Sequence, residues 1–156
     1  MIAVLQRAAS AAVRVDGETV GEIGQGLLIL LGVSVEDSRS DAEALARKIA
    51  RCRIFCDEQG KMNRSVQDVG GSVLVVSNFT LLANYAHGNR PDYLAAARPE
   101  QAVPLYEYFC ALMRAEGLPV STGIFGADMR VMLEGDGPVT IVMNSKELTT
   151  RKESAQ

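Results

Sequence analysis

The stretch Leu27-Leu28-Ile29-Leu30-Leu31 is the best guide to the fold of this chain. It follows the turn sequence Gly24-Gln25-Gly26 and is apolar at every position, which predicts a strand buried on both faces. Val73-Leu74-Val75-Val76 is a second uninterrupted apolar run, rich in β-branched residues, and it predicts another buried strand. The core is therefore expected to be a sheet whose central strands are covered on both sides.

Further strands are expected before these two. Residues 1–6 alternate loosely between apolar and polar side chains, and Ala11-Ala12-Val13-Arg14-Val15 alternates cleanly. Asp16-Gly17 is a strong hairpin sequence, and a strand should follow it over residues 19–23. The N-terminal part of the chain is therefore expected to form antiparallel strands.

Strands are also expected after the first helix and near the C-terminus. Short strands at 54–56 and around Met62 should flank a turn at 57–60. The apolar runs 125–133 and 139–143 predict the closing strands, which would be antiparallel if the segment Gly135-Asp136-Gly137-Pro138 turns the chain.

Two helices are expected. Ser40 with Glu43 three residues later matches a capping box, and an apolar stripe at helical spacing follows it, made of Ala42, Leu45, Ala46, Ile49 and Ala50. A second helix should run from about Pro99 to Glu116, because proline is tolerated in a first turn and Gly117 and Pro119 stop the helix.

These elements predict an α+β fold with strongly curved, mostly antiparallel, barrel-like sheets and two helices packed outside. At 156 residues the chain is expected to form a single domain over residues 1–150. Residues 151–156 are polar and are expected to be a frayed tail.

Composition excludes several classes of protein. The chain is 47% apolar with no apolar run long enough to span a bilayer, and its N-terminus lacks the pattern of a signal peptide, so we expect a soluble cytoplasmic protein. Cys52, Cys56 and Cys110 lack the second Cys or His pair of a zinc site and are interpreted as reduced thiols. The sequence predicts no metal and no cofactor.

Charge gives an ambiguous signal about nucleic acid. The net charge of −3 lacks the basic footprint that is typical of broad nucleic-acid binding. The segment 47–64 is nevertheless locally basic, with Arg47, Lys48, Arg51, Arg53, Lys61 and Arg64. Two interpretations stay open, a solvated helix face and a phosphate-binding surface.

Two short segments about sixty residues apart place small polar residues and unusual backbone beside strands. They are Ser77-Asn78-Phe79-Thr80-Leu81 and Gly135-Asp136-Gly137-Pro138-Val139-Thr140. Conventional catalytic groups are scarce, since His87 is the only histidine and lies in an expected loop. An enzyme built from this chain would depend mainly on positioning, backbone dipoles or the substrate itself.

Together the two segments resemble the SQFTL and NxGPVT signature motifs of the D-aminoacyl-tRNA deacylases. The similarity extends to other stretches, among them Gly88-Asn89-Arg90-Pro91 and residues 122–129. The resemblance implies a homodimer that hydrolyses the ester between a D-amino acid, or glycine, and the 3′-terminal adenosine of tRNA. It also implies that the Gly137-Pro138 peptide is cis and enters the partner subunit's site, where its carbonyls receive the substrate amino group and an L side chain collides with backbone.

The resemblance implies roles for nine residues. Those assigned to catalysis are Ser77, Asn78 and Thr80, and those assigned to substrate binding are Phe79, Phe125, Met129, Gly137, Pro138 and Arg7. Hydroxyl attack normally requires an adjacent base, and none is evident, so Thr80 is expected to shape a site in which the ribose 2′-hydroxyl assists the reaction. Simpler interpretations stay open: core packing for Phe125 and Met129, a surface ion pair for Arg7, and an ordinary hairpin for Gly137-Pro138.

Two departures from the family motifs fall within the signature segments. Asn78 replaces the usual Gln and is one methylene shorter, and Gly135 replaces the usual Asn. They motivate two alternatives, a catalytically weak relative that binds aminoacyl-tRNA and a related deacylase with a trans Gly-Pro and relaxed chirality. The preferred amino acids and tRNAs are not predicted by the sequence.

Overall fold

The computed structural model describes residues 1–148 and is organised around one long strand, β1. The N-terminal half of β1 lies between β3 and β8, and its C-terminal half lies between β2 and β8, with all three pairings antiparallel. Beyond β3 the sheet continues through β6 to β7 with parallel pairings. The bounds are β1 (Ile2–Val15), β2 (Glu18–Ile23), β3 (Gly26–Gly32), β6 (Ser72–Ser77), β7 (Val120–Thr122) and β8 (Arg130–Asn144).

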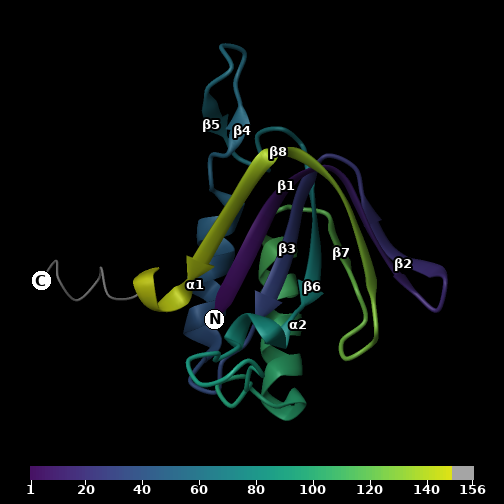
Figure 1. Ribbon diagram of the computed structural model, residues 1–156. Helices are drawn as coiled ribbons and strands as arrows, with labels where there is room; N and C mark the ends of the chain where they lie inside the picture. The colour runs from purple at the N-terminus through teal and green to yellow at the C-terminus, as the bar shows by residue number, and fades with distance from the viewer. Residues whose placement is uncertain (149–156) are drawn as a thin grey trace, which may run out of the picture.

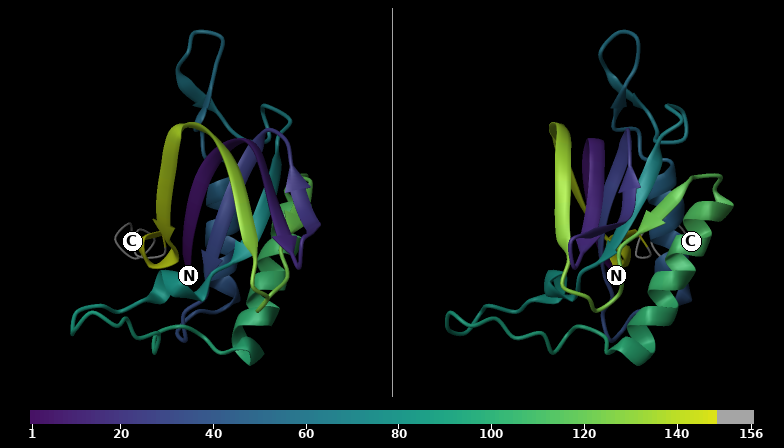
Figure 2. Two further views of the ribbon diagram at one scale, coloured as in Figure 1. Left: turned by 45° about the vertical axis from the view of Figure 1, so that its right-hand side comes forward. Right: turned by 90° about the vertical axis from the view of Figure 1, so that its right-hand side faces the viewer.

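The sheet is mixed, which refines the expected mostly antiparallel arrangement. The parallel pairings follow from the connections, because helix α1 (Arg39–Ala50) lies between β3 and β6, and helix α2 (Pro99–Ala115) lies between β6 and β7. A crossover of this length returns the chain to the same end of the sheet. The predicted α+β class and the curved, barrel-like form are confirmed (Figures 1 and 2).

The sheet curls until β2 approaches β7. Ser121 Oγ donates a hydrogen bond to the Glu22 carbonyl at 3.0 Å. A Cβ at Gly21 would lie 2.3 Å from the Thr122 carbonyl oxygen, so only glycine permits this approach. The barrel is therefore nearly closed by a short seam between two strands that are distant in sequence.

The curled sheet separates two apolar clusters. The larger one lies between the sheet and the two helices and includes Leu5, Ile29, Leu45 and Phe109, which are fully buried. The smaller one lines the other face of the sheet and is made of Ala8, Ala11, Val13, Ile23, Leu28, Leu74 and Val76. Strands buried on both faces are what the apolar runs at 27–31 and 73–76 predicted.

Helix α1 begins slightly earlier than its sequence suggests. Ser38 is the N-cap, and its backbone N–H donates to the Asp41 carboxylate at 2.9 Å, so the predicted Ser40–Glu43 cap is wrong. Two overlapping serine-acid pairs occupy this stretch, and the burial of Asp41 favours the first of them. The predicted stripe from Ala42 to Ala50 is buried as expected.

Helix α2 and the short hairpin follow the prediction closely. The helix ends at Ala115, one residue before the predicted limit, and Gly117 follows with a φ of +87°. The hairpin is β4 (Phe55–Cys56) and β5 (Met62–Arg64), with Gly60 in its turn at a φ of +77°.

Strand β8 corrects the expected end of the fold. The stretch 125–129 lies outside any strand, and β8 runs without reversal from Arg130 to Asn144. The segment Gly135–Pro138 interrupts its pairing with β1 by shifts of register and does not turn the chain. Local turn residues predict a hairpin, but β1 is long enough to pair with both halves of β8 in one direction.

Residues 149–156 lie outside the described part of the chain, as do the end of the predicted domain at 150 and the predicted tail. Within residues 1–148, no helix is long and apolar enough to cross a membrane.

Candidate active site

The segment Ser77–Leu81 leaves the C-terminal end of β6 and enters a 3₁₀ helix, η1 (Phe79–Leu82). Because β6 and β7 are parallel, the residues that follow β7 emerge at the same end of the sheet as those that follow β6. Both faces of β6 are covered, so its end is a fixed point on which an exposed segment can be built. This end of the sheet is the first half of the candidate site.

Asn78 organises the segment. Its side-chain Oδ1 accepts the backbone N–H of Thr80 at 3.2 Å and the Thr80 hydroxyl at 2.5 Å. The amide oxygen thus caps η1 and fixes the direction of the Thr80 side chain. Of the hydrogen bonds within residues 1–148, none uses the Phe79 backbone N–H, which stands at the exposed start of η1.

Aromatic rings flank this segment. The Phe79 side chain is 55% exposed and meets the Tyr93 ring edge to face, with centroids 5.0 Å apart. Phe125 meets Tyr106 at 6.0 Å, and the Tyr106 hydroxyl donates to the Val75 carbonyl at 2.8 Å. These contacts bring Phe125 close to β6 through Tyr106.

A cavity of about 270 Å³ opens beside Phe125, between α2 and β7, and Tyr106, Cys110 and Arg114 also line it. Burial, with Cys110 nearby, raises the pKa of Tyr106 well above its ordinary value, and burial raises the pKa of the Cys110 thiol to about 11. Both groups are therefore neutral at physiological pH. No role for Tyr93 or Tyr106 is predicted from the sequence, because their spacing gives no signal beyond their aromatic character.

Met129 lies apart from Phe125. Its side chain packs against the smaller apolar cluster on the face of the sheet away from the helices, whereas Phe125 packs against the larger one. A Cβ at Gly123 would lie only 2.6 Å from the Met129 sulfur. The two residues therefore border the β7 edge from opposite faces.

Gly137 and Pro138 lie at the apex of β8, are exposed, and are joined by a cis peptide bond. Arg7 supports this segment from within the same chain, with Nε donating to the Asp136 carbonyl at 2.9 Å. Its Nη1 donates to the Ile54 carbonyl at 2.8 Å, and the whole residue is only 8% exposed. Arg7 is thus a buried bracket between β8 and the segment before β4, rather than a surface ion pair alone.

One chain does not bring its two motif segments together. Ser77 is level with Ala3 in the sheet, whereas Gly137 and Pro138 are level with Arg7, three strands away. Four residues along the strands and three strand spacings give a separation of about 20 Å. Figure 1 shows η1 beside the N-terminus and the apex of β8 at the opposite end of the sheet. Ser77, Asn78, Phe79 and Thr80 lie at one end, where Phe125 reaches β6 through Tyr106. Gly137 and Pro138 lie at the other end, where Arg7 holds the neighbouring Asp136.

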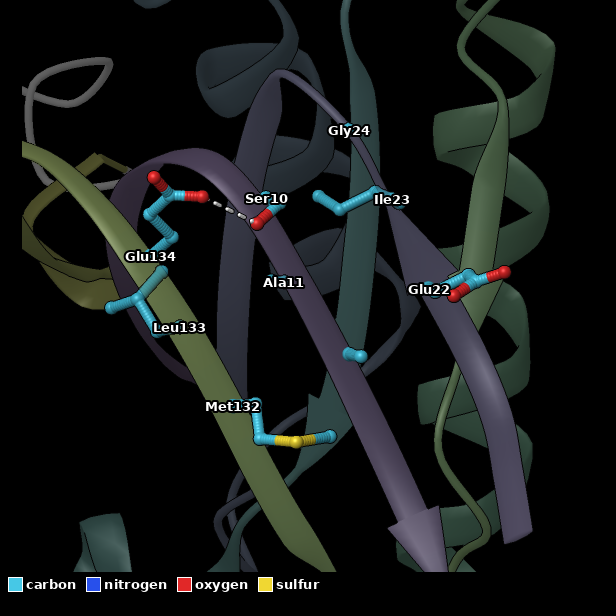
Figure 3. Close-up of a pocket in the computed structure, with 9 residues that line it drawn as sticks. Ser10, Ala11, Glu22, Ile23, Gly24, Met132, Leu133 and Glu134 are labelled. Carbon is cyan, nitrogen blue, oxygen red and sulfur yellow. Dashed lines mark hydrogen bonds between the residues drawn. The ribbon is translucent and has the colours of Figure 1, made fainter.

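A shallow groove of about 620 Å³ lies near the apex of β8. Figure 3 shows Ile23 of β2 and Leu133 of β8 on either side of β1, with Ser10 hydrogen-bonded to Glu134. None of the predicted site residues lines it. Within residues 1–148, no group of three or more His, Cys, Asp or Glu side chains could hold a metal ion.

Comparison with known proteins shows which family contains this chain. The family model described as D-Tyr-tRNA(Tyr) deacylase matches residues 4–144. The chain belongs to this family. A D-aminoacyl-tRNA deacylase of Chloroflexus aurantiacus is 57% identical over 148 residues, covering 95% of this chain and 92% of the relative. One of Thermus aquaticus is 54% identical over 147 residues, covering 94% and 97%.

Solved structures agree with the deacylase family fold. The structure described as the c-Myc DNA Unwinding Element Binding Protein aligns with a TM-score of 0.87 at 42% identity, covering 92% of this chain and 98% of that one. A probable eukaryotic D-amino acid tRNA deacylase aligns with a TM-score of 0.77 at 18% identity, covering 91% and 97%. The second likeness concerns the fold alone.

Proposed function

We propose that this protein is a hydrolase that cleaves the ester bond of D-aminoacyl-tRNA, and of tRNA mischarged with glycine, as a proofreading step in translation. The observation that supports this most is the pair of family motifs, each exposed at a rigid end of the sheet, in a chain 57% identical to a D-aminoacyl-tRNA deacylase. Because its substrate would be an aminoacyl-tRNA in use by the ribosome, we expect it to act in the cytoplasm.

The roles proposed at the η1 end follow from its hydrogen bonds. The Phe79 N–H, which has no acceptor within residues 1–148, is suited to stabilise the negative charge that develops on the ester oxygen. Ser77, Asn78 and Thr80 would shape the pocket, and the ribose 2′-hydroxyl of the substrate would assist attack. Phe79, Phe125 and Met129 would border the terminal adenosine, since aromatic and apolar side chains are suited to stack on a base.

We infer that the active site is shared between two copies of the chain. The two motif segments lie about 20 Å apart in one chain, so a site that uses both needs the Gly137-Pro138 segment of a second copy. An apolar stripe on the sheet face away from the helices supports this. It runs across three strands from Leu30 through Val4 to Val142, and Val142 is 66% exposed. A symmetric dimer would bury such a stripe in an interface above roughly 1,000 Å².

Chiral selection would then be steric. If main-chain carbonyls around Gly137 and Pro138 receive the substrate amino group, the amino group, ester carbon and α-hydrogen are fixed together. An L side chain would have to occupy backbone volume, whereas a D side chain points away and glycine has nothing to clash. Rejection should therefore depend little on the chemistry of the side chain.

Two alternatives to this function can be tested at this site. Asn78 Oδ1 is engaged by Thr80 in its own chain, which favours a weaker hydrolase or a protein that only binds aminoacyl-tRNA. The second alternative is a related deacylase of relaxed chirality, which would cleave an L-aminoacyl ester. It is tied to a trans Gly-Pro, whereas the Gly137-Pro138 peptide of this structure is cis.

Hydrolysis of D-Tyr-tRNA, Gly-tRNA and L-Tyr-tRNA at equal enzyme concentration distinguishes the three. We expect the first two to be cleaved and the third to persist. Binding without cleavage of any of them supports the first alternative, and equal cleavage of L and D supports the second.

A further inference from the structure

A groove along the outer side of α1 is lined by basic side chains that the proposed chemistry does not use. It has a volume of about 770 Å³, and its basic residues are Arg47, Lys48, Arg51 and Arg53. Arg47 lies in the last turn of α1 and Arg51 is its C-cap, so these two cations stand about one helical turn apart, roughly 5.4 Å. The one acidic residue that lines the groove is Glu43, whose carboxylate accepts the Tyr108 hydroxyl at 2.7 Å.

These positive charges are only partly compensated, by Glu43 in the groove and by weak interactions of Arg53 with Asp68 and of Arg51 with Glu116. Among the ion pairs of residues 1–148, none involves Arg47, Lys48 or Arg53. Arg51 approaches Glu116 only at 3.8 Å, and its side chain is 65% exposed, so this pair is weak. A chain with a net charge of −3 thus gathers four cations on one side of one helix and its extension.

The groove adjoins the segment that is proposed to meet the aminoacyl end of the substrate. Arg7 donates to the carbonyls of both Asp136 and Ile54, so a single guanidinium joins the segments that contain Arg53 and Gly137. Arg53 is one residue from Ile54, a step of about 3.8 Å between Cα atoms. The basic groove therefore starts beside the apex of β8 and extends along α1.

We propose that this groove binds the ribose-phosphate backbone of the tRNA whose aminoacyl end enters the site completed by the Gly137-Pro138 segment of the same chain. The inference rests on the proposed function. Arginine is suited to the task, because its planar guanidinium donates two parallel hydrogen bonds to a phosphate. Backbone contacts of this kind position RNA without reading its sequence, as a proofreading enzyme that accepts many tRNAs requires.

The test uses Arg47→Gln, Arg53→Gln and the double variant, with Arg14→Gln as the matched control. Glutamine keeps a long polar side chain and a good helix former at Arg47. Arg14 is exposed near the end of β1 and belongs neither to the groove nor to the site. Affinity for deacylated tRNA is measured over a range of salt, and kcat/KM is measured on D-Tyr-tRNA and on the minimal ester 3′-O-D-tyrosyl-adenosine.

We expect the double variant to bind tRNA about tenfold more weakly and to lower the salt slope of log K by roughly 1.5, the loss of two phosphate contacts. Its kcat/KM should fall about tenfold on D-Tyr-tRNA and stay within twofold on the adenosine ester, while Arg14→Gln behaves as wild type. Unchanged tRNA affinity and slope would overturn the inference. So would an equal loss on both substrates, or an equal loss in Arg14→Gln.

The proposed function and this inference can fail separately. If the wild-type protein cleaves neither ester, the proposed function is wrong, and the tRNA-binding measurements still decide the groove. If it cleaves both and the groove variants match the wild type, only the groove inference is wrong.

Discussion

Thr80 is held in place by Asn78 and has no base beside it in the described structure, because its hydroxyl bonds to the Asn78 amide oxygen. An amide oxygen accepts a hydrogen bond but does not remove a proton, so nucleophilic activation of Thr80 lacks a partner. We predict that Thr80→Ala retains turnover within about tenfold of wild type, roughly 1.4 kcal/mol of transition-state stabilisation. A substrate whose terminal ribose lacks the 2′-hydroxyl should be nearly inert. Trapping an acyl ester on Thr80 would contradict this assignment.

Arg7 is the second residue with a prediction of its own. Arg7→Lys cannot reach the carbonyls of Asp136 and Ile54 together, and one of them loses its donor. We expect unfolding free energy to fall by about 2 kcal/mol, and Tm by roughly 4–8 °C. Deacylation should fall further than stability alone explains, since the Gly137-Pro138 segment loses its bracket. Arg14→Lys, at an exposed position, is the control, and equal Tm values for the two variants would show that the bracket is unimportant.

The contacts of these residues could not be predicted from the sequence. Asn78 replaces the usual Gln of the family motif, and its side-chain oxygen caps η1. The hydrogen bond from the Thr80 N–H to Asn78 depends on the 3₁₀ helix that follows β6, and a short polar segment does not predict such a helix. Arg7 was assigned to substrate binding, with a surface ion pair as the simpler interpretation. In the structure its Nε donates to the Asp136 carbonyl of the same chain, because the pairing of β1 with β8 places the two segments side by side.

Among the elements, the seam between β2 and β7 closes the barrel at Gly21. A methyl group there would meet the Thr122 carbonyl oxygen at 2.3 Å, and backbone must move to relieve the clash. We predict that Gly21→Ala costs about 1–3 kcal/mol of unfolding free energy. Gly24→Ala is the control, because a Cβ at Gly24 has no atom within 4 Å. Chemical denaturation of both variants checks this, and equal stability would mean that the seam is loose.

The start of α1 gives a pH-dependent prediction. Burial opposes ionisation of Asp41, but hydrogen bonds from Ser145 and the Ser38 backbone, with the charge of Lys146, hold its pKa below the ordinary value of 3.8. The ionised carboxylate therefore stabilises the fold above about pH 4, and this contribution is lost as pH falls through the lowered folded pKa. Unfolding free energy measured from pH 6 to pH 3 should decline more steeply in wild type than in Asp41→Asn. Parallel curves would contradict the assignment.

Local patterns predicted most elements, and long-range pairing explains the exceptions. The apolar runs, the helical stripes and the Asp16-Gly17 turn lie where the sequence indicated. The segment Gly135–Pro138 has the composition of a turn but lies inside β8. The residues of β8 that precede it and those that follow it both pair with β1. Parallel pairing of β3 with β6 depends likewise on a crossover, which no short window of sequence specifies.

In the molecule as a whole, we propose that the two ends of the sheet form one active site only across a dimer. The η1 segment and the apex of β8 are held about 20 Å apart by the register of four strands, so flexing of a loop does not bring them together. Antiparallel association of two copies through the sheet face away from the helices would place the β8 apex of each copy near the partner's η1. Two sites per dimer would result.

Complementation between two inactive chains tests whether the site is shared. One chain has Thr80→Tyr, which obstructs the η1 end, and the other has Pro138→Trp, which obstructs the apex of β8. Each variant is exposed at the substituted position, and sedimentation checks that each still forms dimers. The two are co-expressed, and D-Tyr-tRNA hydrolysis is compared with each variant alone. A shared site gives every mixed dimer one intact site out of two, so activity should recover to about a quarter of wild type at equal expression. A mixture that stays as inactive as its parents, although mixed dimers are present, would contradict the shared site.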